Sequence, residues 1–233
     1  MRKISCLLAS LALSTFAVAD SPAPRTDRVL TQAEQQALTA DQVLERLSAG
    51  NIRFVDGDLT TRNHSSLVRD AAAGQAPKAM VLSCVDSRVP VEDIFDQGIG
   101  DIFVARVAGN IENTDILGSI EFATKVSGAK LIVVLGHESC GAIRAAIDNV
   151  QLGNITALLE NIKPAVEALS DYPGEQTSSN PEFVHLVAEK NVELTVQNIL
   201  EKSPIVADMV ASGEVNIIGG VYDLHSGEVE LLN

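Results

Sequence analysis

Residues 131–142 read Leu-Ile-Val-Val-Leu-Gly-His-Glu-Ser-Cys-Gly-Ala, a continuous apolar run followed by a polar turn and small residues. The apolar run, taken from Ala129 to Leu135, predicts a β-strand covered on both faces, because a strand with one wet face alternates polar and apolar residues. The segment Ala142–Val150 predicts a helix that crosses back over the sheet. A strand, a turn that carries His137 and Cys140, and a crossover helix therefore form the central unit of the fold.

Three further apolar runs have the same continuous character, and helical patterns lie between them. These runs are Lys78–Cys84, Asp101–Val107 and Glu214–Leu224. Thr114–Ser127 predicts a second crossover helix, and Asn180 followed by Pro181 predicts the start of a later one. Alternating strands and helices are typical of an α/β fold with a mostly parallel sheet. Glu228–Leu232, which follows a Ser-Gly turn, predicts an antiparallel strand at the sheet edge.

Two helices are expected ahead of the first strand, as an N-terminal helical arm. Two pairs of residues match a capping box, in which two side chains satisfy free N–H groups at a helix start. The pairs are Thr31 with Glu34 and Thr39 with Gln42. Gly50 is expected to end the second helix, since glycine is common just past a helix C-terminus.

Residues 1–19 carry the pattern of a secretory signal peptide. Arg2 and Lys3 form a basic start, a mainly apolar stretch follows, and Ala17-Val-Ala19 matches the small residues that signal peptidase recognises. The apolar stretch is too short to cross a bilayer. A buried N-terminal helix is the alternative interpretation. A signal peptide would place the mature protein in a bacterial periplasm.

The expected mature chain, residues 20–233, is long enough for one domain with a substantial core. Its first residues, 20–30, are expected to form a flexible leader. The full sequence has 31 Asp and Glu against 17 Lys and Arg, a formal net charge of −14. This charge argues against binding to nucleic acid or to an anionic membrane surface.

Two cysteines remain in the expected mature chain, and each follows a predicted strand. Cys84 ends the first run, and His137 and Cys140 follow the strand quoted above. In open α/β sheets, binding sites form beyond the carboxyl ends of the strands, so these three side chains can meet there. Two thiolates and one imidazole suit zinc, and three protein ligands leave a fourth position open, as in catalytic zinc sites.

Each of these residues also has a simpler interpretation. A buried cysteine at a strand end is usually a small apolar residue, and a lone histidine is more often a surface or core residue than a ligand. A disulfide between Cys84 and Cys140 would suit an exported protein, although it leaves His137 unexplained. A structural zinc site or a redox module, with Asp86 as fourth ligand or both cysteines oxidised, is the non-enzymatic alternative.

Asp86 and Arg88 lie two and four residues after Cys84. An arginine can hold a carboxylate through two parallel hydrogen bonds and keep it ionised. Such a carboxylate could accept a hydrogen bond from water on the metal and orient it. An ordinary salt bridge at a strand end is the simpler interpretation.

The two segments that carry these residues resemble the paired signature of the β-carbonic anhydrases. The segments are Cys84-Val-Asp-Ser-Arg-Val89 and Gly136-His-Glu-Ser-Cys-Gly-Ala142, and the likeness runs from about Asp41 to the C-terminus. It includes Asp96-Gln-Gly-Ile-Gly-Asp-Ile-Phe-Val and Ala108-Gly-Asn. The resemblance implies a central sheet with strands in the order 2-1-3-4, counted along the chain, plus the antiparallel edge strand.

The resemblance also implies an activity and a site. The enzyme would be a lyase that reversibly hydrates carbon dioxide to bicarbonate and a proton, by attack of zinc-bound hydroxide. Cys84, His137 and Cys140 would bind one Zn²⁺ per chain, and Asp86 with Arg88 would be the catalytic dyad.

A homodimer or a tetramer is implied as well. Gln75 matches a glutamine that binds substrate from the neighbouring chain, and Phe103 matches an apolar residue of the substrate pocket. Val107 departs from the family pattern, because a polar residue is common after the motif arginine, here Arg106. This departure puts the local hydrogen bonding in doubt but not the metal site.

Other functions fit the sequence less well. Zinc nucleobase deaminases also use one His and two Cys, but their pattern needs Cys-x-x-Cys, which this chain lacks. An enzyme of this fold could also hydrolyse another small cumulated molecule, such as carbon disulfide. The histidines outside the motif, His64, His185 and His225, are weak candidates for proton transfer, because most such residues are surface or structural.

The signal peptide leads to a direct test. Cleavage after Ala19 should leave a product that begins at Asp20 and lies outside the cytoplasm. Cell fractionation followed by N-terminal sequencing measures both. A protein that stays in the cytoplasm with residues 1–19 intact would contradict the assignment.

Overall fold

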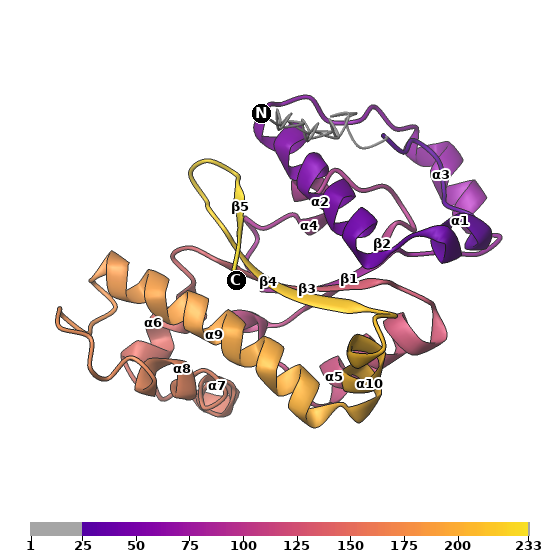
Figure 1. Cartoon of the computed structure of the whole chain (residues 1–233). Helices are drawn as coiled ribbons and strands as arrows, with labels where there is room; N and C mark the ends of the chain where they lie inside the picture. The colour runs from indigo at the N-terminus through magenta and orange to yellow at the C-terminus, as the bar shows by residue number, and fades with distance from the viewer. Residues whose placement is uncertain (1–24, 233) are drawn as a thin grey trace, which may run out of the picture.

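Five strands form one mixed sheet through the middle of the molecule (Figure 1). Along the chain they are β1 (Ala79–Ser83), β2 (Ile102–Arg106), β3 (Leu131–His137), β4 (Asn216–Tyr222) and β5 (Val229–Leu231). They lie side by side in the order β2-β1-β3-β4-β5. The first four strands are parallel, and β5 runs antiparallel to β4. The expected α/β class, strand order and antiparallel edge strand are confirmed.

The structure is a computed structural model that describes residues 25–232. The predicted signal peptide, and residues 20–24 of the predicted leader, lie outside the described residues. Within the leader, Arg25 pairs with Asp58, and the carbonyl of Thr26 accepts a hydrogen bond from Arg62. None of the helices in the described part of the chain is long and apolar enough to span a bilayer.

Burial explains the continuous apolar runs. Every residue of β1 and β3 is buried, since both strands lie inside the sheet and both faces of the sheet are covered. Val81 of β1 stands between Val104 of β2 and Val133 of β3 and belongs to the core on one face. The next residue along β1, Leu82, belongs to the core on the other face.

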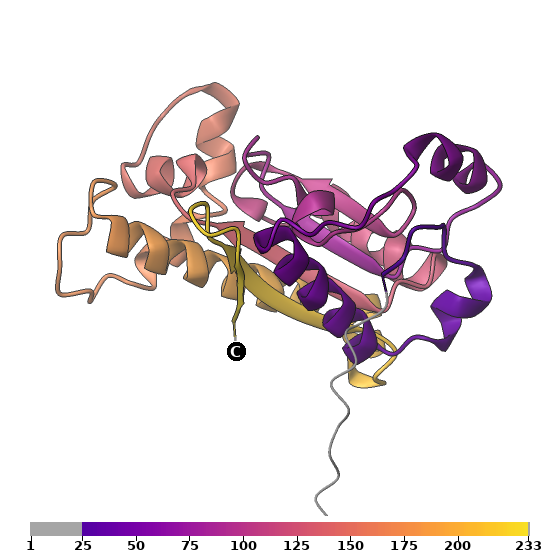
Figure 2. The same ribbon diagram turned by 90° about the horizontal axis from the view of Figure 1, so that it is seen from above.

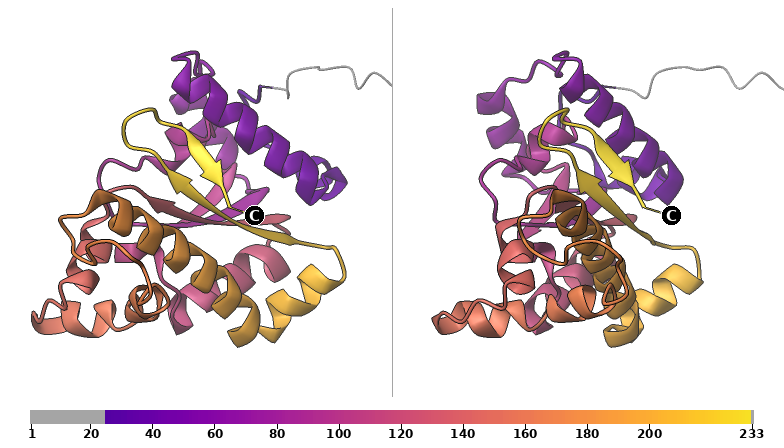
Figure 3. Two further views of the ribbon diagram at one scale, coloured as in Figure 1. Left: turned by 60° about the vertical axis from the view of Figure 1, so that its left-hand side comes forward. Right: turned by 90° about the vertical axis from the view of Figure 1, so that its left-hand side faces the viewer.

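Helices cover both faces of the sheet (Figures 1 and 3). On one face lie α1, α2, α3 and α4, and on the other α5, α9 and α10, while α6, α7 and α8 gather near the end of α9 (Figure 2). The bounds are α1 Gln32–Ala37, α2 Ala40–Val55, α3 His64–Ala71, α4 Val91–Ile94, α5 Thr114–Glu121, α6 Gly141–Ile147, α7 Gly153–Leu159, α8 Lys163–Glu167, α9 Pro181–Lys202 and α10 Pro204–Ala211. A 3₁₀ turn, η1, spans Ala108–Asn110, and a π-helical turn, η2, spans Phe122–Val126.

The predicted helix starts are confirmed. Both capping boxes are formed, at Thr31 and at Thr39. Asn180 caps α9 by accepting a hydrogen bond from the backbone N–H of Glu182, and Pro181 is the first helical residue. The sequence analysis does not predict α3, α4, α7 or α8, which are short and lack a capping box.

The prediction that the second helix ends at Gly50 is wrong, because α2 continues to Val55. Gly50 is buried inside this helix, where a Cβ atom would lie 1.9 Å from the carbonyl oxygen of Phe95. The glycine therefore allows a close contact between backbones and does not end the helix.

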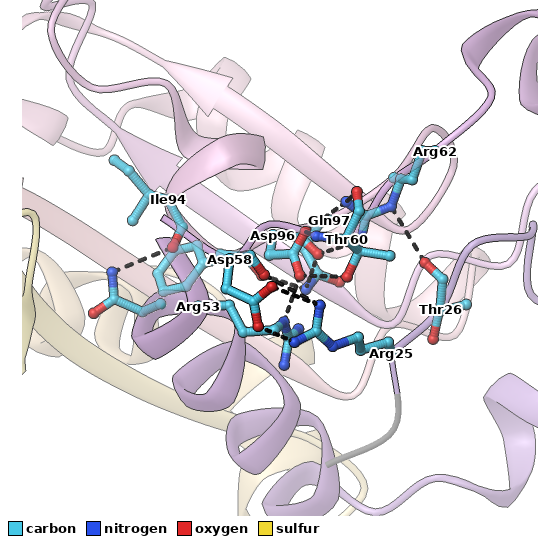
Figure 4. Close-up of polar contacts among 12 residues, drawn as sticks. Arg25, Thr26, Arg53, Asp58, Thr60, Arg62, Ile94, Asp96 and Gln97 are labelled. Carbon is cyan, nitrogen blue, oxygen red and sulfur yellow. Dashed lines mark hydrogen bonds and ion pairs between the residues drawn. The ribbon is translucent and has the colours of Figure 1, made fainter. Parts of the chain in front are cut away.

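A polar network holds the N-terminal segment against the loop that leads to β2 (Figure 4). Asp96 accepts hydrogen bonds from Arg53 Nε (2.5 Å), Arg62 Nη1 (2.6 Å) and Thr60 Oγ1 (2.6 Å). Burial raises the pKa of the Asp96 carboxyl, but the hydrogen bonds from Thr60, Arg53 and Arg62 outweigh it and hold the pKa below its usual range.

A second ion pair lies at the amino ends of the central strands. Lys78 Nζ is 3.1 Å from Asp101 Oδ1, and both side chains are 2% exposed. The backbone of Lys78 also links three strands, because its N–H donates to Asp101 O and its carbonyl accepts from the N–H of Lys130. Burial lowers the pKa of Lys78, and the nearby Asp101 carboxylate opposes this shift.

Two glycines let α9 lie close to the sheet. A Cβ at Gly219 of β4 would lie 2.6 Å from Val192 Cγ1, and a Cβ at Gly136 of β3 would lie 2.7 Å from Val192 Cγ2. Both branches of Val192 are therefore confined, so that rotating the side chain cannot relieve a clash on either side.

Gly219→Ala should lower the free energy of unfolding by about 1–3 kcal/mol, because the added methyl group overpacks this contact. Val192→Ala should make room for that methyl group. The double variant should therefore be less destabilised than the sum of the two single variants, by roughly 0.5–3 kcal/mol. Denaturant unfolding of all four proteins measures this, and strictly additive losses would contradict the proposed contact.

Candidate metal centre

The parallel pairing of β1 with β3 brings three potential metal ligands together. Cys84 follows β1, His137 is the last residue of β3, and Cys140 comes three residues later. Ser83 of β1 lies beside Leu135 of β3, so both strands finish at the same edge of the sheet. The sulfur atoms of the two cysteines and a ring nitrogen of His137 all lie within 4.8 Å of one another, and all three residues are buried.

A tight turn returns Cys140 to the side of His137. Ser139 adopts a φ of 51°, in the left-handed region, and the N–H of Glu138 still donates to Tyr222 O as though β3 continued. Cys140 then occupies the N-cap position of α6, without a capping hydrogen bond from its side chain. This geometry explains why two ligands three residues apart can share one spot after a strand.

The orientation of His137 suits a metal ligand. Its Nδ1 lies 2.8 Å from the carbonyl oxygen of Glu138, so Nδ1 carries the proton and donates. Its Nε2 is buried and has no hydrogen-bond partner among the described residues. The lone pair of Nε2 is therefore available to a metal ion.

The two sulfur atoms lie 3.9 Å apart, and both cysteines are free. A tetrahedral zinc ion with Zn–S bonds of about 2.3 Å separates two sulfur ligands by about 3.8 Å. The spacing, the orphaned Nε2 and the soft donor set therefore fit zinc. A thiol hydrogen bond from Cys140 lowers the pKa of Cys84 and raises that of Cys140, since the two share one proton.

Residues outside the predicted site hold Cys84 in place. The N–H of Gly109 donates to Cys84 Sγ at 3.4 Å, and Asn191 of α9 donates to the Gly109 carbonyl at 2.8 Å. Arg106 donates from Nε to the carbonyl of Cys84 and from Nη2 to that of Asp86. The motif Ala108-Gly-Asn and the motif arginine Arg106 were the sequence signals for this support, and nothing in the sequence pointed to Asn191.

Asp86 and Arg88 form the pair that the sequence predicts. Arg88 donates from Nε to Asp86 Oδ1 (2.9 Å) and from Nη2 to Oδ2 (2.8 Å), and its backbone N–H also reaches Oδ1 (3.0 Å). These hydrogen bonds hold the pKa of Asp86 far below its usual range. Asp86 Oδ2 lies 3.8 Å from His137 Nε2, so the carboxylate faces the same spot as the three candidate ligands.

Gln75 and Phe103 are not brought to this centre within one chain. Gln75 is exposed just before the amino end of β1, while Cys84 follows the carboxyl end of the same strand. Phe103 lies on the edge strand β2 beside Met80 of β1, and its ring meets that of Phe122 edge-on at 6.2 Å. Only a neighbouring chain could bring either residue to the metal centre.

Comparisons with known proteins identify the family of this chain. The sequence profile of the family described as carbonic anhydrase matches residues 79–229. Carbonic anhydrase 2 of Mycobacterium tuberculosis is 39% identical over 191 residues, which cover 79% of this chain and 89% of that protein. The carbonic anhydrase of Pseudomonas aeruginosa is 33% identical over 72% of this chain and 79% of its own length.

A solved structure agrees in sequence and in shape. The crystal structure of the β-carbonic anhydrase CafA of Aspergillus fumigatus superposes with a TM-score of 0.65 at 30% identity, covering 73% of this chain and 82% of that one. The family profile, the relatives and the sheet order lead to one conclusion. The chain belongs to the β-carbonic anhydrase family.

Proposed function

We propose that this protein is a zinc enzyme that reversibly hydrates carbon dioxide to bicarbonate and a proton. The convergence of Cys84, His137 and Cys140, with Asp86 facing the same spot, is the observation that carries the proposal. A zinc ion held by the two thiolates and the imidazole makes a nucleophile available near neutral pH, because it lowers the pKa of water from about 15.7 towards about 7.

Asp86 and Arg88 orient the attacking water. Asp86, kept ionised by the two hydrogen bonds from Arg88, accepts a hydrogen bond from the attacking water and fixes the direction of its lone pair. Arg88 is half exposed, so its charge also faces solvent, where the anionic product departs. The surrounding cluster, which includes Ile111 and Ile143, offers apolar surface that suits an uncharged, apolar substrate.

The proposal includes assembly and export. β2 is an edge strand of the sheet, and the exposed ring of Phe122 lies beside it, which suits contact with a second copy. Such a copy could deliver Gln75 to this chain's metal centre, as the family resemblance implies. Two β-carbonic anhydrases from Sordaria macrospora are each described as tetrameric. We assign this chain to a homodimer or tetramer in the periplasm.

The purified mature protein should contain one zinc per chain. Cys84→Ser, His137→Ala and Cys140→Ser should each lose most of the metal and the activity, because each removes one of three ligands. His64→Ala, which removes an exposed histidine on α3, should keep both. Elemental analysis combined with thiol titration measures this, and full zinc in all three ligand variants would refute the site.

Asp86→Asn should keep zinc and lose rate by about 10²–10⁴-fold, because an amide cannot replace the carboxylate as acceptor. Asp70→Asn, the same change at an exposed position of α3, should leave the rate unchanged. Stopped-flow hydration assays with metal analysis measure both. An Asp86→Asn protein with normal activity would mean that Asp86 and Arg88 form only a salt bridge.

A further inference from the structure

A small cavity at the amino ends of the central strands is lined mainly by charged side chains. The metal centre lies at the opposite edge of the sheet, beyond the carboxyl ends of β1 and β3. Two of the cavity's arginines, Arg46 and Arg53, lie seven residues apart on α2 and therefore on one face of that helix. The charged residues that line the cavity are Arg46, Arg53, Arg62, Lys78, Asp96 and Asp101.

The charges around this cavity do not balance. Arginine stays charged in proteins, so burial cannot neutralise the three guanidinium groups. With the Lys78 ammonium also charged, four cations against two carboxylates leave an excess of two positive charges. The neighbouring ion pair of Arg25 and Asp58 is neutral as a whole and does not change this excess. Solvent screens the excess poorly, because the Arg62 side chain is 9% exposed and that of Arg53 is 13% exposed.

Several N–H donors at the cavity have no acceptor. Lys78 Nζ is buried and has no hydrogen-bond partner among the described residues; its contact with Asp101 Oδ1 at 3.1 Å is an ion pair without hydrogen-bond geometry. Within residues 25–232, the half-buried Arg46 forms no hydrogen bond or ion pair, and Arg53 donates only from Nε, to Asp96 (Figure 4). A buried ammonium without an acceptor is costly, so these donors favour an acceptor that enters the cavity.

The cavity has a volume of about 10 Å³, which is room for one particle the size of a water molecule. Chloride is only slightly larger than water, whereas bicarbonate has four heavy atoms and is too large. A water molecule would also fit, and it could donate to Asp101 Oδ1, which lacks a hydrogen-bond partner as well. Water would, however, leave the excess positive charge in place.

We propose that this cavity is a binding site for one halide-sized anion, chloride above all, held by Lys78, Arg46 and Arg53. The ion would link α2 to the start of β1, because the two arginines lie on the helix and Lys78 directly precedes the strand. It would also oppose the burial that lowers the pKa of Lys78. An ion that binds only the folded chain stabilises it in proportion to the logarithm of its concentration once the site is nearly full.

Bromide locates the site directly, because it resembles chloride and scatters X-rays anomalously. Crystals of the mature protein grown in sodium bromide, measured at the bromine absorption edge, should show an anomalous peak within hydrogen-bond distance of Lys78 Nζ. Density in the cavity without an anomalous signal would mean a water molecule and would overturn the proposal, even if bromide were found elsewhere on the surface.

Thermal unfolding tests binding in solution. The melting temperature of the zinc-loaded mature protein should rise as chloride replaces gluconate, an anion too large for the cavity, at fixed ionic strength. Arg46→Gln removes one cation and leaves the pair of Lys78 and Asp101 intact. It should raise the chloride concentration needed for half of this effect by roughly ten-fold or more.

Arg69→Gln is the matched control, because it removes an exposed arginine on α3 and should leave the chloride dependence unchanged. The comparison of variants also separates this site from any contact of chloride with the metal centre at the opposite edge of the sheet. Circular dichroism verifies that each variant folds. A parent protein whose melting temperature ignores chloride, or a folded Arg46→Gln protein with the parent's chloride dependence, would refute the site.

Discussion

Parallel pairing between β1 and β3 is the constraint on which the rest of the molecule depends. Parallel neighbours finish at the same edge of a sheet, so residues 56 positions apart in the chain, Cys84 and Cys140, meet there with their sulfur atoms 3.9 Å apart. The same pairing needs a helical crossover between strands and a cover on both faces. The order of strands, the layers of helices and the place of the site are therefore consequences of one arrangement.

Helix α9 connects the packing of the sheet to the chemistry at its edge. Val192 lies against Gly136 and Gly219, one residue along Asn191 supports the backbone at Gly109, and the first turns carry Phe183 into the apolar cluster that contains both cysteines. His185 lies on the same helix, beside Glu138. A shift of α9 would disturb the core and the support of Cys84 together.

The sequence predicts what depends on neighbours along the chain. The four parallel strands follow from continuous apolar runs, and the capped helix starts follow from Thr31, Thr39 and Asn180. The grouping of Cys84, His137 and Cys140 follows from their positions after strands. Prediction from the sequence fails where a residue is explained by a contact with a distant part of the chain. Gly50 is a glycine because Phe95 lies against it, and Asn191 faces Gly109, 82 residues away.

The buried pair of Lys78 and Asp101 has a consequence for the order of folding. An ammonium ion that enters an apolar core without its counter-ion costs several kcal/mol. The amino end of β1 therefore cannot be desolvated until the loop before β2 supplies its carboxylate, and both are held by the Lys78 N–H to Asp101 carbonyl hydrogen bond. We therefore expect β2 to dock at the edge of the sheet in the same step that buries β1.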